Sequence, residues 1–211
     1  HAVVRSPKHP DREIDLFELV QDVERRGVQM PLLLRLSDVL EARIGALAGA
    51  FHEAIEELDY EAPYRGVYPI KVNQQRHLVE EVVHFSRQYH MGLECGSKPE
   101  LMVVLAELSD PEALIICNGY KDAEFIELAL MARKLGRNVI IVVEQFEEVE
   151  LVLQKEKEVD VEAVIGVRAK LATMGVGRWR TSAGDRAKFG LTMRETLNLV
   201  ELLKRHQRLD M

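Results

Sequence analysis

The chain has 211 residues and carries 28 Lys and Arg against 35 Asp and Glu, which gives a formal net charge of −7 at neutral pH. This acidic balance argues against a nucleic-acid partner, and 47 % hydrophobic with 30 % charged residues is globular composition rather than disorder. No apolar run reaches the roughly 18 residues that would suggest a membrane span, so we expect no membrane partner.

The two ends and the cysteines indicate a cytoplasmic piece of a longer protein. The sequence opens with His1 and shows no secretory leader, and it closes at Met211 directly after a helical pattern. Cys95 and Cys117 are too few and too far apart in sequence for a disulfide framework or a zinc knuckle. We therefore expect buried, reduced thiols.

Residues 1–60 are predicted to form a segment that precedes the main domain. Residues 1–14 are polar and contain two prolines, so we expect an irregular arm. A capping-box pattern at Asp15 begins a first helix. Residues 31–36 (PLLLRL) predict a short strand, and Ser37 begins a longer helix with apolar residues every three or four positions.

Residues 61–211 alternate between β-rich runs and helical patterns. The β-rich runs are 66–72, 92–96, 113–119, 138–144 and 163–169. The helical patterns are 77–90, 99–108, 122–135, 146–159 and 192–206. Several runs are apolar on both faces, as in parallel strands that helices cover. The pattern predicts an α/β fold of five βα units.

Two architectures fit five consecutive βα units: an open doubly wound sheet, or part of a (β/α)8 barrel. A complete barrel needs about 200 residues or more, and five units already occupy most of this chain. We expect a partial TIM-type barrel whose strands are parallel and adjacent in chain order. A third strand on the far side of the first would instead indicate the doubly wound sheet.

In both architectures the functional groups lie at the carboxyl ends of the strands. The first predicted strand ends in Lys71, where an uncompensated buried charge would be costly. The residues alone leave two interpretations: a lysine that forms a Schiff base, or a lysine that reaches solvent from the end of a strand. The second strand ends at Glu94 to Ser97, and the fifth ends at Arg168.

Other motifs carry less weight. Gly175 and Gly177 resemble part of a dinucleotide fingerprint, but the third glycine and the preceding strand are missing, so we expect no such site. Residues 170–188 form a long basic loop, which is either a lid over an anionic ligand or a solvated loop. The seven histidines have no metal-ligand spacing, and no metal site is predicted.

The strand ends together resemble a known family. Residues 68–74 (YPIKVNQ) resemble the cofactor-lysine motif of biosynthetic arginine decarboxylases, which are pyridoxal-phosphate enzymes of the alanine racemase-like family. Further segments are similar to other signatures of that family: 92–101, 117–122, 166–169 and 188–191. The likeness covers nearly the whole chain in order, and the loop at 170–188 favours the arginine branch over the ornithine and diaminopimelate branches.

The resemblance assigns roles to several residues. It implies that Lys71 holds pyridoxal phosphate as a Schiff base and that Arg168 lies near the phenolic oxygen of the cofactor. Glu94 and Glu100 match acidic positions that pack around the cofactor and orient this arginine. Ser97 is a candidate hydrogen-bond donor behind them. Residues 1–60 would contribute to a β domain or to its junction with the barrel.

The reaction implied is decarboxylation of L-arginine to agmatine and carbon dioxide in polyamine biosynthesis. Decarboxylation of another basic amino acid and a non-catalytic pyridoxal-phosphate-binding barrel are the alternatives. The resemblance also implies a homodimer or higher homo-oligomer, and magnesium is sometimes required in this branch. The phosphate loop, the ring-nitrogen carboxylate and the interface cysteine of the family come later than residue 211, so we expect these residues alone to be inactive.

Overall fold

The computed structural model describes residues 2–170 and 189–206, which fall into two compact units. The first unit contains the residues up to Tyr64 together with Glu80–Tyr89. The second contains Arg65–Val79 and the described residues from His90 onward. One predicted helix, at residues 77–90, therefore contributes to both units, which the sequence pattern does not indicate.

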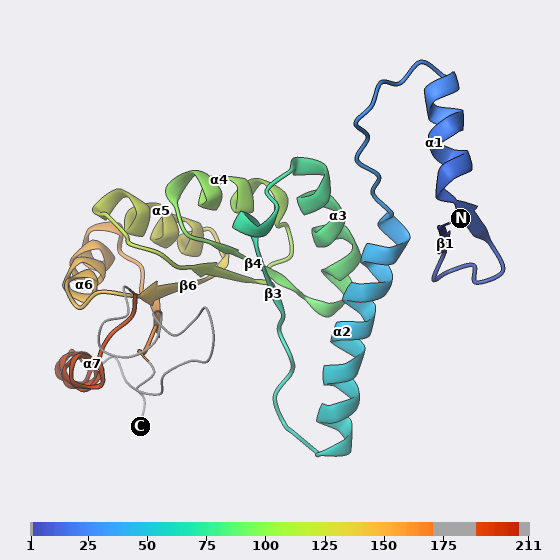
Figure 1. Ribbon diagram of the computed structural model, residues 1–211. Coiled ribbons are helices and arrows are strands. Elements are labelled where there is room, and N and C mark those ends of the chain that lie inside the picture. The colour runs from blue at the N-terminus through green and yellow to red at the C-terminus, as the bar shows by residue number, and fades with distance from the viewer. Residues whose placement is uncertain (1, 171–188, 207–211) are drawn as a thin grey trace. The chain divides into compact units, whose positions relative to one another are not determined.

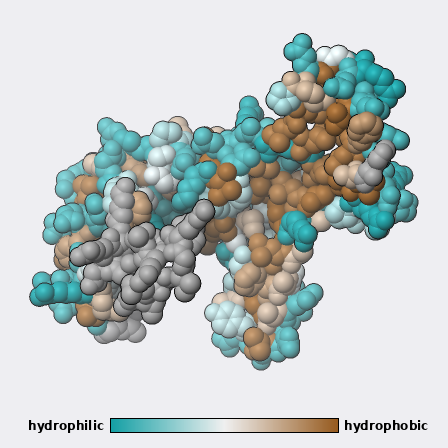
Figure 2. All heavy atoms as spheres, viewed as in Figure 1, coloured by the Kyte–Doolittle hydropathy of each residue, from teal (hydrophilic) through white to brown (hydrophobic). Residues whose placement is uncertain are grey.

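The first unit contains a two-stranded hairpin and two helices (Figure 1). Its elements are β1 (Val3–Arg5), β2 (Glu13–Asp15), α1 (Leu16–Arg25) and α2 (Ser37–Glu57), and Glu80–Tyr89 adds most of a further helix. Asp15 begins α1 as predicted, because its carboxylate accepts the backbone N–H groups of Phe17 and Glu18. Figure 2 shows a broad apolar area over this unit. Exposed large apolar residues of the unit include Phe17, Leu33 and Leu58.

The N-terminal segment has short strands, but at other positions than predicted. The prediction of an irregular arm at residues 1–14 is wrong, because β1 and β2 pair in antiparallel register and Arg5 Nε lies 2.6 Å from Glu13 Oε1. The prediction of a strand at residues 31–36 is also wrong. That run forms no ladder with any described strand, and an extended apolar run becomes a β-strand only when a neighbour supplies hydrogen bonds.

The second unit is built on a five-stranded parallel sheet whose order follows the chain, β3-β4-β5-β6-β7. The strands are β3 (Val67–Pro69), β4 (Gly92–Cys95), β5 (Leu114–Cys117), β6 (Asn138–Val143) and β7 (Val164–Val167). This order confirms the partial barrel and rules out the doubly wound alternative. A parallel bridge between Ala169 and Leu191 continues the order beyond β7.

Helices follow the strands as the sequence predicts. They are the short turn η1 (Ile70–Val72), α3 (Arg76–Ser86), η2 (Arg87–Tyr89), α4 (Lys98–Glu107), α5 (Ala123–Lys134), α6 (Glu147–Val159) and α7 (Met193–Arg205). Figure 1 shows α4 and α5 along one side of the sheet. Each predicted helix is present, with its ends shifted by a few residues at most.

The core of the second unit lies between the sheet and helices α4 to α7, because most of α3 and all of η2 belong to the first unit. Along β6 the side chains alternate, and Val139, Ile141 and Val143 are at most 1 % exposed, whereas the residues between them are half-buried. Phe125 and Leu130 of α5 are at most 2 % exposed. Burying an aliphatic side chain of this size contributes about 1.5–3 kcal/mol. The opposite face of the sheet, which would face the barrel interior, remains available for a site.

Candidate active site

A cavity of about 550 Å³ lies on that opposite face, within the second unit. This volume is within the roughly 300–1,000 Å³ of small-molecule and cofactor pockets. The lining residues are Val67, Pro69, Lys71, Glu94, Ile116, Asn118, Val142, Val167 and Arg168. Four of them are polar or charged and follow or end strands. The structure therefore brings Lys71, Glu94 and Arg168 together, as expected of parallel strands.

Lys71 lies in the turn η1 directly after β3. The strand was expected to continue to residue 72 but ends at Pro69, whose missing N–H cannot join a ladder. Ile70 is 1 % exposed and anchors the turn, while the Lys71 side chain is 67 % exposed. Its Nζ lies 3.7 Å from Glu94 Oε1. The lysine reaches solvent and also lines the cavity, so the two sequence-based interpretations are compatible.

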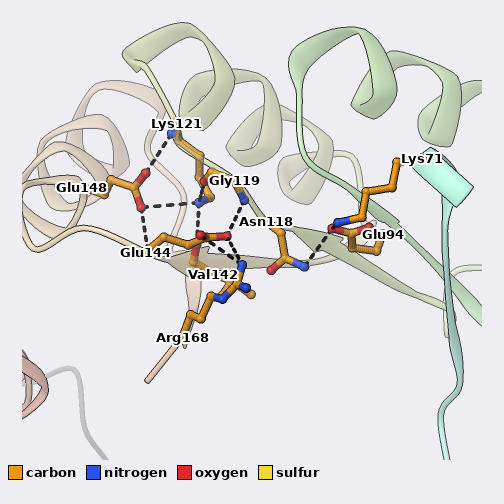
Figure 3. A network of polar contacts seen from close by, with 9 residues as sticks. All are labelled: Lys71, Glu94, Asn118, Gly119, Lys121, Val142, Glu144, Glu148 and Arg168. Atoms are coloured by element: carbon orange, nitrogen blue, oxygen red, sulfur yellow. Dashed lines mark hydrogen bonds and ion pairs between the residues drawn. The ribbon is translucent and has the colours of Figure 1, made fainter. Parts of the chain in front are cut away.

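Glu94 is a buried carboxylate with one unused oxygen. Its Oε1 accepts a hydrogen bond of 2.9 Å from Asn118 Nδ2 (Figure 3). Its Oε2 is buried and has no hydrogen-bond partner among the described residues. An unsatisfied buried acceptor costs about 1–3 kcal/mol. A ligand that donates a hydrogen bond in this cavity would remove that cost.

Arg168 follows β7 and is paired with Glu144. Its Nη1 lies 3.2 Å from both carboxylate oxygens of Glu144, and its guanidinium lies 5.2 Å from the ring centroid of Phe189. The carboxylate that contacts Arg168 is thus Glu144, and the expectation that Glu94 and Glu100 orient Arg168 stays a prediction. Glu144 directly follows β6, the neighbour of β7, whereas the other two carboxylates lie on or after β4, farther along the sheet.

Ser97 and Glu100 do not line the cavity. Ser97 Oγ accepts the backbone N–H of Glu100 at 3.4 Å and caps α4. Glu100 Oε2 accepts the backbone N–H of Gly96 at 2.7 Å. These contacts stabilise the loop between β4 and α4, so both side chains act on the loop behind Glu94. A direct role for either in cofactor binding stays a prediction.

Two residues of the site were missed by the sequence reasoning. Asn118 stands at the end of the third predicted strand but received no role, although it orients Glu94. Glu144 is the last residue of the fourth predicted strand, 138–144, and it pairs with Arg168. The rule that functional groups follow parallel strands would have found both. The lid or solvated loop expected at 170–188 lies outside the described residues from 171 onward.

The two cysteines are buried neighbours on β4 and β5. Cys95 Sγ lies 3.8 Å from Cys117 Sγ, and both thiols are free. The hydrogen bond with Cys117, followed by burial, raises the pKa of Cys95 far above its ordinary value, so its thiol stays protonated.

Across residues 2–170 and 189–206, no group of three or more His, Cys, Asp or Glu side chains could hold a metal ion. Within these ranges, no helix has the length and apolar character needed to cross a membrane.

Comparison with known proteins identifies the class to which this fold and site belong. Residues 44–211 match the family model of the pyridoxal-dependent decarboxylases, in the part described as their pyridoxal binding domain. The match extends over most of the chain and over every residue that lines the cavity. The chain therefore belongs to the pyridoxal-dependent decarboxylase family.

Individual relatives give a narrower similarity. The chain is 53 % identical over 204 residues to the biosynthetic arginine decarboxylase of Gloeobacter violaceus, covering 97 % of this chain and 32 % of that protein. It is 54 % identical to the biosynthetic arginine decarboxylase of Thermosynechococcus vestitus over the same shares. It thus spans about a third of the length of these relatives.

Solved structures agree with the fold. The biosynthetic arginine decarboxylase of Campylobacter jejuni superposes with a TM-score of 0.79 at 32 % identity, covering 92 % of this chain and 31 % of that one. A diaminopimelate decarboxylase of Helicobacter pylori superposes with a TM-score of 0.64 at 20 % identity, over 90 % of this chain and 43 % of that one. The second likeness supports the fold alone.

Proposed function

We propose that the protein carrying this chain decarboxylates L-arginine to agmatine and carbon dioxide with pyridoxal phosphate as its cofactor. The observation that carries the proposal is the convergence of Lys71, Glu94 and Arg168 on one cavity at the carboxyl ends of the strands. The choice of arginine is supported by the relatives, which are named biosynthetic arginine decarboxylases. A place in polyamine biosynthesis follows from the resemblance.

The residues present fit pyridoxal phosphate, which carries an aldehyde and an anionic phenolic oxygen. Lys71 presents an exposed primary amine that could bind the aldehyde. Glu94 Oε2 is a buried acceptor without a partner among the described residues. Arg168 supplies a guanidinium cation, which suits an anionic oxygen. Lys71 and Arg168 thus match the aldehyde and the anionic oxygen of the cofactor, and Glu94 Oε2 remains available to a donor group in the cavity.

The cofactor, when bound, supplies the electron sink that allows the α-carboxylate to leave as carbon dioxide. The chain contributes positioning and proton handling. Lys71 Nζ is the attachment atom, and Glu94 Oε1, 3.7 Å away, is placed to take a proton from Nζ or return it. Asn118 fixes that oxygen through its 2.9 Å hydrogen bond. Glu144 holds the Arg168 guanidinium at the cavity wall.

Further properties remain proposals from the resemblance. They are a homodimer or higher homo-oligomer, a magnesium requirement and a cytoplasmic location. Glu100 and Ser97 are proposed to shape the loop beneath the cofactor, since their hydrogen bonds fix the backbone after β4. Residues 1–60 are proposed to join the barrel to the remainder of the protein.

The test measures carbon dioxide release from carboxyl-labelled amino acids by the natural gene product that contains this sequence. We expect release from L-arginine that depends on pyridoxal phosphate and is abolished by Lys71→Ala. Lys98→Ala is the matched control, since Lys98 follows β4 at the same edge but pairs with Asp122 and Glu124. Release from L-lysine or L-ornithine instead would favour another basic substrate. Cofactor binding without any release would favour a non-catalytic barrel.

A further inference from the structure

A buried polar network lies behind the cavity and ends at Arg168 (Figure 3). Its members are Lys121, Gly119, Glu148, Glu144 and Arg168. The Lys121 side chain is fully buried, and Glu148 and Glu144 are nearly so. Two cations and two carboxylates balance in charge. Lys121 and Glu148 do not line the cavity, so the proposed chemistry gives them no direct task.

Lys121 joins the loop after β5 to strand β6. Its Nζ donates to the carbonyl oxygens of Gly119 and Val142, each at 2.5 Å, and lies 3.4 Å from Glu148 Oε2. Burial lowers the pKa of Lys121, while the carboxylates of Glu148 and Glu144 oppose that change. An isolated buried ammonium is costly, so these acceptors are what allow the lysine to remain here.

Glu148 extends the connection from the β5 loop to the residue after β6. Its Oε1 accepts the backbone N–H of Lys121 at 2.8 Å, and its Oε2 accepts the backbone N–H of Glu144 at 2.9 Å. Glu148 lies in the first turn of α6, where the helix dipole favours a negative charge. The Glu148 carboxylate therefore fixes both the loop after β5, at Lys121, and the residue after β6, Glu144.

Glu144 transmits this arrangement to the cavity. Its Oε1 accepts the backbone N–H of Gly119 at 2.7 Å, and both of its oxygens lie 3.2 Å from Arg168 Nη1. Gly119 has a φ of +76°, and a Cβ there would lie 2.6 Å from the Gly96 carbonyl oxygen. Glycine is thus required for the turn that aims this N–H at Glu144.

We propose that Lys121 and Glu148 are positioning residues that set the Arg168 guanidinium through Gly119 and Glu144. The inference rests on the proposed function, because Arg168 matters there as a contact of pyridoxal phosphate. Replacing a buried ion network by apolar residues of equal volume is often neutral for stability. The role inferred for this network is therefore to hold the Arg168 guanidinium in one geometry. Lys121 does not line the cavity itself, and it sets the position of Arg168, which does.

A double-mutant cycle on the natural gene product tests this inference. The dissociation constant of pyridoxal phosphate is measured for the wild type, Lys121→Met, Arg168→Ala and the double variant. We expect Lys121→Met to weaken cofactor binding by roughly tenfold in the wild-type background and to have little further effect once Arg168 is absent. The pH profile of the bound cofactor's visible absorbance should shift toward that of Arg168→Ala.

Two variants make the test specific. Lys155→Met is the control, because Lys155 also has two carboxylate partners, Glu127 and Glu158, and none of these residues belongs to the network. This variant should change neither the dissociation constant of pyridoxal phosphate nor the pH profile of its absorbance. Glu148→Gln replaces Lys121→Met if the latter does not fold, because it keeps the side-chain size and removes one acceptor. A similar loss of affinity from Lys121→Met in both backgrounds would overturn the inference alone. A wild-type protein that binds no pyridoxal phosphate would overturn the proposed function as well.

Discussion

The two tasks of the Glu144 carboxylate can be separated by replacing it with Ala and, independently, with Gln. The side chain is 1 % exposed, accepts the Gly119 N–H at 2.7 Å and pairs with Arg168 at 3.2 Å. Ala removes both interactions. Gln keeps an amide oxygen that can accept the Gly119 N–H, and it loses the charge that attracts Arg168.

The structure sets the expected magnitudes. An amide left without its acceptor costs about 1–3 kcal/mol, toward the lower end here because Gly119 is only half-buried. Arg168 is 49 % exposed, so losing its ion pair costs about 1 kcal/mol or less after solvent screening. Since each 1.4 kcal/mol is a factor of ten, Glu144→Ala should accelerate local opening at Gly119 by about tenfold, and Glu144→Gln by less than about fivefold.

Amide hydrogen exchange, followed by mass spectrometry on peptides that contain Gly119, measures this opening in the natural gene product. Peptides from α7, which make none of these contacts, serve as the internal reference. Equal acceleration in both variants would show that the charge, rather than acceptance of the Gly119 N–H, holds the turn. No acceleration in either would refute the assignment of Glu144 as the residue that fixes this loop.

Three further predictions concern the isolated chain, one helix and the core. Residues 1–211 alone should release no carbon dioxide from labelled arginine and bind pyridoxal phosphate weakly at most, since phosphate sites of barrels are built by the loops after strands seven and eight; turnover by a 24.1 kDa monomer would contradict this. Hydrogen bonds from Thr192 lower the pKa of Glu195 below its ordinary 4.5. The capping box should therefore stabilise α7 fully above pH 4.5, and this stabilisation should be lost as the pH falls through the lowered pKa, which hydrogen exchange of α7 peptides measures. Thr192→Ala should remove about 1 kcal/mol of this local stability at neutral pH. Phe125→Ala should destabilise the protein by about 3–5 kcal/mol in denaturant unfolding, whereas Phe17→Ala, at a side chain 56 % exposed, should change little.

The barrel could be predicted because its strands and helices are signalled locally. β-rich runs of five to seven residues, spaced for one intervening helix, specify parallel strands in chain order. The hairpin of β1 and β2 could not be predicted in this way. Its strands have three residues each, and they are defined by pairing with each other rather than by an apolar pattern. Residues 31–36 show the converse, an apolar pattern without a partner among the described strands.

The site was predictable as far as strand ends determine it. Lys71, Glu94 and Arg168 converge because the carboxyl ends of parallel strands meet at one edge of the sheet. The partner of Arg168 depends on which strand is its neighbour, and this is known only once the sheet order is fixed. The buried position of Lys121 gave no sequence signal, since a lysine after a strand is usually solvated.

The central claim is that Lys71 is the attachment point of pyridoxal phosphate in this cavity. Borohydride reduction of the cofactor-loaded natural gene product, followed by proteolysis and mass spectrometry, measures it directly by locating the modified lysine. We predict that the phosphopyridoxyl group is found on the peptide containing Lys71 and is absent from the Lys71→Ala variant. Modification of Lys98 or Lys188 instead, with Lys71 unmodified, would contradict the account.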